Sequence, residues 1–296
     1  YVVSNIAPHN SKLGTYLKDI SPVIAMKPDA LIMSDPGLIM MVRDAFPEIP
    51  IHLSVQANAV NYATVKFWQK QGIERVILSR ELSLEEIETI REHVPDMELE
   101  VFVHGALCMA YSGRCLLSGY MNKRDPNQGT CTNACRWSYD VKAGQENETG
   151  DIVQANEIDK KGTAPQMVIP TLGEGTPSTQ VFMLEEKEKP GELMPAFEDE
   201  HGTYIMNSKD LRAVQHVGRL TQMGVHSLKI EGRTKSHYYC ARTAQVYRKA
   251  IDDAVAGKPF DSTLMGSLET LAHRGYTEGF LRRHAHHAYQ NYEYGH

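Results

Sequence analysis

Residues 75–104 read RVILSRELSLEEIETIREHVPDMELEVFVH: a short apolar run, a helical pattern and a second apolar run. Ser83 and Glu86 have the spacing of a capping box, in which the two side chains satisfy exposed backbone N–H groups where a helix begins. The segment therefore predicts a strand over 75–78, a helix over 84–93 and a strand over 99–103. Such a unit is typical of a parallel sheet with right-handed crossovers.

The same alternation continues on both sides of this segment. Further apolar runs occupy 1–6, 30–33, 51–55 and 227–230, and helical patterns occupy 60–71 and 236–256. The six strands predict an α/β fold with the strand spacing of a TIM-type (β/α)8 barrel, two strands short of the eight that close one. A doubly wound nucleotide-binding sheet is the less favoured alternative, because neither Gly-x-Gly-x-x-Gly nor Gly-x-x-x-x-Gly-Lys-Ser/Thr is present.

Residues 144–200 interrupt the alternation. They contain 13 acidic and 4 basic residues, a net charge of −9 against −6 for the whole chain, so the remainder carries +3. We expect an inserted excursion of short strands and loops here, with a partly disordered loop as the alternative. The flanking parts are predicted to be barrel strands and a cysteine loop (1–143), the end of the barrel with a helix over 209–223 (201–260), and a C-terminal helix or linker (261–296).

The overall composition fits a soluble globular protein, with 42% hydrophobic and 23% charged residues among 296. No apolar run approaches the roughly 18 residues that a membrane span needs. A secretory signal pattern is also absent. We therefore expect a cytoplasmic protein without a membrane partner.

Four of the five cysteines lie within 28 residues, directly after the strand at 99–103. In a cytoplasmic protein such a cluster suggests a metal site before disulfides. Structural zinc favours short Cys-x-x-Cys knuckles, which are missing here, so the wider gaps suit a 4Fe-4S cluster better. Zinc and four unrelated thiols remain the alternatives. The predicted ligands are Cys108, Cys115, Cys131 and Cys135.

Polar residues stand where the predicted strands end, the edge at which barrel enzymes place their catalytic groups. His104 and Glu231 are candidate proton handlers. Arg80, Lys229 and Arg233 are candidates to bind a dicarboxylate, since guanidinium groups grip carboxylates bidentately. Alternatively, any of these residues forms a structural ion pair, for example Lys229 or Arg233 with Glu81.

Basic and aromatic residues accompany the cysteines. Such a mixture can bind RNA phosphates and stack on bases, although a solvated loop with scattered charges is an equal alternative. The basic candidates are Arg114, Lys123, Arg124 and Arg136, and the aromatic ones are Tyr111, Tyr120 and Trp137.

Several motifs together resemble the collagenase-like peptidase family, the thirty-second family of peptidases of unknown catalytic type. The segment 104–118, HGALCMAYSGRCLLS, resembles its signature, and 122–131, 198–204, 207–211 and 227–236 extend the match. Among the members of this family, the motifs are most similar to a branch that hydroxylates tRNA.

The resemblance implies further properties. Family members begin two strands earlier and continue into a small β-domain, which implies truncation at both ends. We expect the edge at 1–6 to be covered by another chain, in an oligomer, or by a retained N-terminal fragment. Relatives carry an iron–sulfur cluster and hydroxylate RNA bases or quinone precursors without oxygen. The tRNA branch converts the wobble uridine to 5-hydroxyuridine, with prephenate as the implied hydroxyl source and dicarboxylate co-substrate.

Two other functions stay open. A peptidase receives little support, because His-Glu-x-x-His and Gly-x-Ser-x-Gly are both absent. A non-catalytic RNA-binding scaffold would bind tRNA and leave its bases unchanged.

Overall fold

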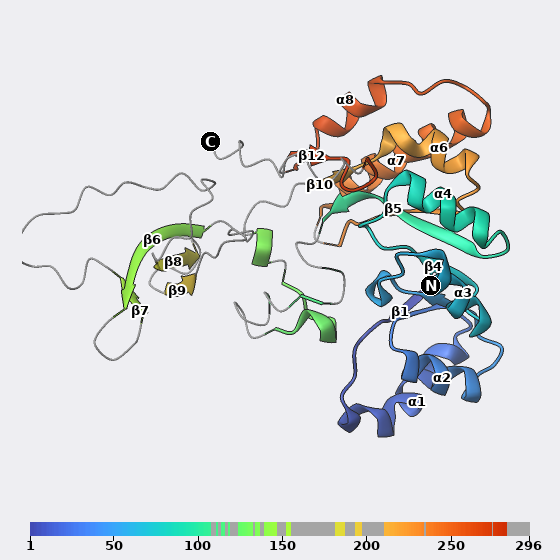
Figure 1. The fold of residues 1–296 in the computed structure, drawn as a ribbon, viewed down its shortest axis with the longest axis horizontal. Helices are drawn as coiled ribbons and strands as arrows, with labels where there is room; N and C mark the ends of the chain where they lie inside the picture. The colour runs from blue at the N-terminus through green and yellow to red at the C-terminus, as the bar shows by residue number, and fades with distance from the viewer. Residues whose placement is uncertain are drawn as a thin grey trace, which may run out of the picture. The chain divides into compact units, whose positions relative to one another are not determined.

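The computed structural model describes residues 1–107, 111, 114–115, 118, 124–132, 134–136, 139–146, 152–154, 181–186, 193–196, 210–233, 235–273 and 275–282. The chain forms two compact units (Figure 1). Unit 1 comprises Tyr1–Thr132 and Ser208–His284, and unit 2 comprises Asn133–Asn207 and Ala285–His296.

A mostly parallel sheet organises unit 1. Its parallel strands lie in the order β1-β2-β3-β4-β5-β11, and each falls at one of the six predicted runs. This confirms the α/β class with a mostly parallel sheet. The strands are β1 (Val2–Ser4), β2 (Leu31–Met33), β3 (Ile51–Leu53), β4 (Arg75–Ile77), β5 (Glu98–Ala106) and β11 (Ser227–Ile230).

In unit 1, helices alternate with strands along the chain, which can be followed in Figure 1 from blue to orange. Ser83 and Glu86 do form the predicted capping box at α4. Ser236 caps α7 by accepting the N–H of Tyr239. The helices are α1 (Asn10–Ala25), α2 (Pro36–Ala45), α3 (Tyr62–Lys70), α4 (Leu84–His93), α6 (Val217–Gln222), α7 (His237–Val255) and α8 (Thr263–Glu269), with 3-10 turns at Val55–Ala57, Pro126–Gln128, Ala134–Arg136 and Val214–His216.

The helix predicted over 209–223 is wrong at its start. Asp210–Arg212 is a strand, β10, that pairs antiparallel with the end of β5, and β12 (Tyr276–Thr277) pairs with β10. Leu211 and Asp210 are buried, and the Asp210 carboxylate accepts a 2.8 Å hydrogen bond from Lys235 Nζ. Backbone pairing with β5 and this ion pair stabilise the extended form, so the helix begins only at Val217.

The faces of β5 differ because side chains alternate along a strand. Leu99, Val101 and Val103 are buried in the hydrophobic core of unit 1. Glu98, Glu100 and Phe102 occupy the opposite face, and Arg75 of β4 forms ion pairs with both carboxylates. One face of the sheet is therefore apolar and the other carries charges.

Unit 2 contains an antiparallel sheet with the order β7-β6-β8-β9. Its strands are β6 (Tyr139–Glu146), β7 (Ile152–Gln154), β8 (Val181–Glu186) and β9 (Leu193–Ala196). The sheet begins five residues before the expected insertion at 144.

Among the described residues of the chain, no helix combines the length and apolar character that crossing a membrane requires.

Candidate functional site

Arg80 and Glu231 meet at the carboxyl ends of β4 and β11. Arg80 Nη2 forms an ion pair with the Glu231 carboxylate, and the Arg80 guanidinium lies 3.8 Å from the centre of the Phe102 ring. The Arg80 side chain is 7% exposed and that of Glu231 27% exposed. The Glu231 carboxylate and the Phe102 ring therefore hold a largely buried guanidinium, and the carboxylate itself is partly exposed.

Lys229 pairs with Glu100 and lies on the charged face of the sheet. Its Nζ is 2.9 Å from Glu100 Oε1, and Arg75 Nη1 is 3.4 Å from Glu100 Oε2. Burial raises the pKa of the Glu100 carboxyl. The charges of Lys229 and Arg75 and the hydrogen bonds from Lys229 and Ser227 together outweigh this effect, so the pKa lies below its usual value. The structural ion pair foreseen for Lys229 therefore exists, with Glu100 in place of Glu81.

Arg233 lies beside the cysteine segment. Its Nη2 donates a hydrogen bond to the carbonyl oxygen of Cys131 at 3.4 Å, and the residue is exposed. The structure therefore links the turn after β11 directly to one predicted cluster ligand.

His104 is 1% exposed and lies among tyrosine rings. Its ring centre is 5.7, 5.4 and 5.5 Å from those of Tyr239, Tyr247 and Tyr276. The Tyr247 hydroxyl donates to Val103 O at 2.7 Å and accepts the N–H of Ala213, so the 3.3 Å contact with His104 Nδ1 fits an Nδ1–H donor. Burial lowers the pKa of His104 to about 4, so the ring is neutral at pH 7.

The tyrosine rings around His104 come from α7 and β12, whereas Arg80 pairs with Glu231 and lies over Phe102. A register shift between Lys229 and Ile230 makes Lys229 face Phe102 and Ile230 face His104, so one residue of β5 is skipped. The two predicted proton handlers are joined through their backbones, where Glu231 N–H donates to His104 O at 2.9 Å. Their side chains have different surroundings.

Two of the four predicted ligand cysteines lie in the described part of unit 1. Cys115 and Cys131 are half-buried, and Cys135 is half-buried in unit 2. Cys108 and Lys123 lie outside the described residues. Within the described ranges, no group of three or more His, Cys, Asp or Glu side chains could hold a metal ion.

Hydrogen bonds tie the Cys115 and Cys131 segments together. Ser118 Oγ and Thr132 Oγ1 are 2.8 Å apart, and Ser118 Oγ also accepts the N–H of Thr132 at 3.1 Å. Sulfur donors of this kind suit an iron–sulfur cluster or zinc. The residues present therefore fit such a group in chemistry.

The basic candidates are only partly described. Arg114 and Arg124 are exposed, which suits contact with phosphates. The backbone of Arg136 ends the 3-10 turn of unit 2 that includes Cys135.

Sequence reasoning missed Phe102 and Glu100, which contact Arg80 and Lys229. Both could have been found from alternation, because they stand two residues apart in the strand predicted at 99–103 and therefore share a face.

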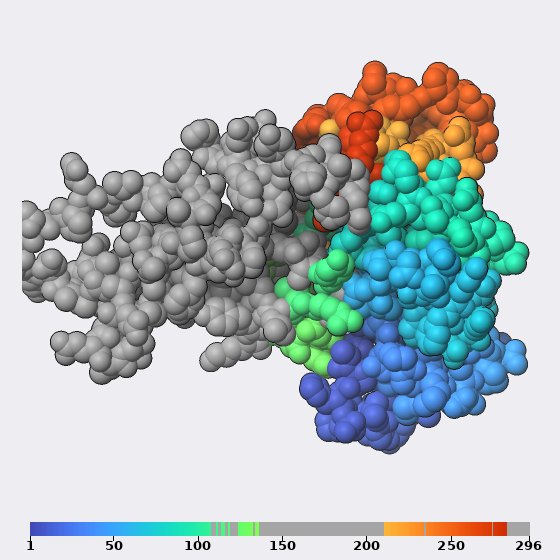
Figure 2. Space-filling view, in the orientation of Figure 1, coloured from blue at the N-terminus to red at the C-terminus, as the bar shows by residue number. Residues whose placement is uncertain are grey.

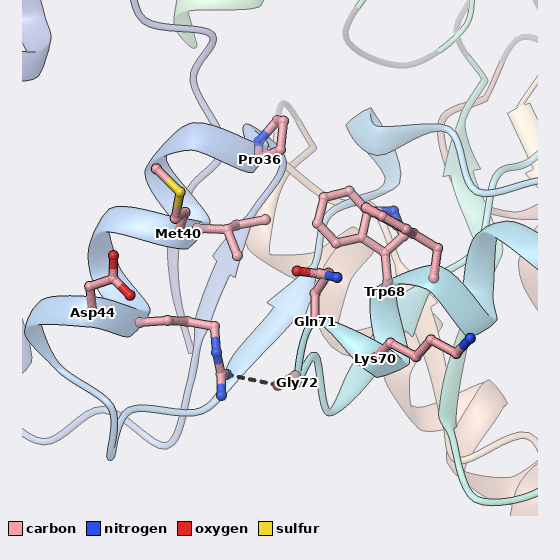
Figure 3. A pocket seen from close by; sticks show the side chains of 10 residues that line it. Pro36, Met40, Asp44, Trp68, Lys70, Gln71 and Gly72 are labelled. Carbon is pink, nitrogen blue, oxygen red and sulfur yellow. Dashed lines mark hydrogen bonds between the residues drawn. The ribbon is translucent and has the colours of Figure 1, made fainter.

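A pocket of about 420 Å³ lies between α2 and α3 (Figure 3). Its wall includes Met40, Trp68 and Arg43, whose Nη1 donates to Gly72 O at 2.8 Å. None of the predicted site residues lines this pocket.

Known proteins place the chain in a family. A model described as peptidase family U32 matches residues 1–291. The chain is 75% identical over 295 residues to tRNA hydroxylation protein P of Escherichia coli K12, and 72% identical over 299 residues to the protein of that name from Haemophilus influenzae. Each match covers 100% of this chain and 64% of the relative, so the chain spans about two thirds of their length.

A more distant relative is the 23S rRNA 5-hydroxycytidine C2501 synthase of Escherichia coli K12. It is 26% identical over 95% of this chain and 36% of its own length. These matches confirm the resemblance carried by the cysteine segment and the strand ends: the chain belongs to peptidase family U32.

Proposed function

We propose that the protein containing this chain hydroxylates tRNA, converting the wobble uridine to 5-hydroxyuridine without molecular oxygen. The observation that carries the proposal is the 75% identity, over the whole chain, to a protein named for tRNA hydroxylation. The relative named as an rRNA 5-hydroxycytidine synthase supports the same class of reaction on RNA. Action on tRNA would place the protein in the cytoplasm.

The parallel strands are proposed to belong to a (β/α)8 barrel. The order β1-β2-β3-β4-β5-β11 supports this, because consecutive strands are neighbours and their carboxyl ends meet at one edge. Two further strands would lie between β1 and β11, from a part of the longer protein, a bound fragment or a second copy.

The four cysteines are proposed to hold a 4Fe-4S cluster, with zinc as the alternative. When bound, such a cluster supplies one-electron transfer. The half-buried thiols of Cys115 and Cys131, on segments tied by Ser118 and Thr132, support the proposal.

Arg80 is proposed to bind a carboxylate of a dicarboxylate co-substrate such as prephenate. Its guanidinium is already held against Phe102 by the Glu231 carboxylate, which an incoming carboxylate would replace. Glu231 would then be released to hold or move a proton. His104, neutral and enclosed by tyrosines, would support the strand ends.

The exposed Arg114 and Arg124 are proposed to contact tRNA phosphates. A single-stranded anticodon loop can splay its wobble base into a pocket, which a duplex would resist.

Mass spectrometry of wobble nucleosides tests the function. A strain without its own tRNA-hydroxylating protein receives the full-length protein, its Cys115→Ser variant or, as a control, a Cys240→Ser variant, whose cysteine lies on α7 outside the cysteine segment. We expect 5-hydroxyuridine with the wild type and with Cys240→Ser, and loss with Cys115→Ser. Absence of 5-hydroxyuridine with the wild type would contradict the proposal. Proteolysis that survives Cys115→Ser and chelation would favour a peptidase instead.

A further inference from the structure

We infer that Asn127 is a positioning residue for the cysteine site. It holds the backbone at Cys115 in the place that cluster binding requires. The inference rests on the proposed cluster and assigns a role to a residue that is not itself a ligand.

Asn127 joins three segments of unit 1. Its backbone N–H is held by Asp125 Oδ1 at 2.8 Å, and its carbonyl oxygen accepts the N–H of Ala7 at 3.0 Å. Its side-chain Nδ2 donates to the carbonyl oxygen of Cys115 at 3.3 Å. The backbone contacts dock the turn, and the side chain alone reaches the cysteine.

The turn itself is firmly built. Thr130 Oγ1 donates to Asp125 O at 2.7 Å, and Gly129 N–H closes the 3-10 turn on Pro126 O at 3.2 Å. Gln128 Nε2 donates to Ala7 O, which is a second contact with the segment between β1 and α1. In Figure 2 the green residues of this segment lie against the blue beginning of the chain.

The Asn127 amide is satisfied on one side only. Its Oδ1 is buried and has no hydrogen-bond partner among the described residues. A buried acceptor without a donor costs free energy, so the benefit of this amide lies in its Nδ2 donor. That donor serves Cys115, and Ser118 and Thr132 complete the link between the Cys115 and Cys131 segments. Groups that orient ligands in this way influence metal binding strongly.

The test compares Asn127→Asp and Asn127→Ala with Gln128→Ala. Both Asn127 variants keep the backbone contacts and lose the donor to Cys115, and only the first adds charge. Gln128→Ala loses a contact with Ala7 and leaves Cys115 untouched. The full-length proteins are reconstituted without oxygen. Iron and sulfide per chain, visible circular dichroism and the rate of bleaching in air are then measured.

We expect both Asn127 variants to bleach about 10-fold faster than the wild type and to change the dichroism of the cluster. Gln128→Ala should match the wild type, and melting of the metal-free proteins should be alike. Unchanged bleaching in either Asn127 variant would overturn the inference, as would equal damage by Gln128→Ala. A wild type without iron would overturn the cluster itself. Normal iron with unchanged bleaching in all variants would refute only the role of Asn127.

Discussion

His104 and the Arg80–Glu231 pair both come from strand ends, yet their surroundings are opposite. His104 is enclosed by Tyr239, Tyr247 and Tyr276, and its Nε2 has no hydrogen-bond partner among the described residues. Glu231 is partly exposed and neutralises a guanidinium that rests on Phe102. The His104 ring is enclosed and uncharged at pH 7, whereas the Arg80–Glu231 pair is charged and its carboxylate is partly exposed.

The difference shows that a position at a strand end does not determine a chemical role. The register shift opposite Ile230 turns His104 toward α7, whereas Phe102 remains on the charged face. A proton handler must reach substrate, which favours Glu231 over His104. His104 and Glu231 meet through their backbones where β5 pairs with the end of β11. Variants at this backbone contact and on either side of it therefore test the comparison.

Gly105→Ala should have the largest effect, because Gly105 lies at the backbone contact between β5 and Glu231. Gly105 has φ +105°, and an added Cβ would lie 2.3 Å from the carbonyl oxygen of Glu231. Strained backbone and a clash with main chain together should lower the free energy of unfolding by about 3 kcal/mol or more. Urea denaturation measures this.

Gly257→Ala is the matched control. Gly257 has φ +69°, but its added Cβ would meet nothing within 4 Å. It should cost only the conformational penalty, about 1 kcal/mol. Equal losses of unfolding free energy in the two variants would show that the backbone contact between β5 and Glu231 tolerates a side chain.

His104→Phe should remove a pH dependence of stability. Burial lowers the pKa of His104 to about 4, below the usual 6.5, so the unfolded chain takes up this proton first as the pH falls. The wild type should therefore lose stability from about pH 6.5 down to pH 4, by about 2 kcal/mol at pH 5.

The measurement is urea denaturation of both proteins at pH 7, 6 and 5. His52 and His226 also have lowered pKa values, chiefly through burial, so both proteins retain some dependence. Only the difference between them reports on His104. If stability depended on pH in the same way in both proteins, the site among the three tyrosines would accept a charged His104 ring.

The sequence predicted the strands better than the directions of their side chains. Apolar runs located β1 to β5 and β11, because burial against helices requires them. The orientation of His104 depends on a register shift between strands far apart in the chain, and Asp210–Arg212 becomes a strand through pairing with β5. Lys229 was recognised as charged, but its partner Glu100 lay on another strand. The direction of a side chain, the strand at Asp210–Arg212 and the partner of Lys229 all depend on pairing between strands far apart in the chain. The local sequence pattern does not contain this information.

Glu231→Gln should have a modest effect on stability and a large one on the proposed reaction. The amide still accepts from Arg80, so unfolding should change by about 1 kcal/mol. If Glu231 handles a proton, 5-hydroxyuridine should fall about 100-fold. Mass spectrometry of tRNA from a complemented deletion strain provides the measurement.

The Arg212–Glu269 pair offers a matched control. Arg212 likewise pairs with a glutamate and lies over an aromatic ring, with its guanidinium 4.7 Å from the Tyr276 centre. Glu269→Gln should alter stability similarly and leave hydroxylation intact. Comparable losses of product in both variants would remove the assignment of Glu231.

Arg124→Ala should have the smallest effect on stability, below about 0.5 kcal/mol, because the side chain is exposed. If Arg124 contacts a tRNA phosphate, its removal should weaken binding of all cognate tRNAs alike. The slope of log affinity against log salt should then decrease by about 0.7 to 0.9, one released counterion for a single-stranded or duplex contact.

Arg219→Ala is the control, because Arg219 on α6 pairs with Glu85 and Glu88 and its charge is already balanced. Filter binding of tRNA to the full-length protein at several salt concentrations gives both slopes. Identical slopes for wild type and Arg124→Ala would exclude this residue from the RNA surface, and an equal decrease with Arg219→Ala would show that only overall charge is measured.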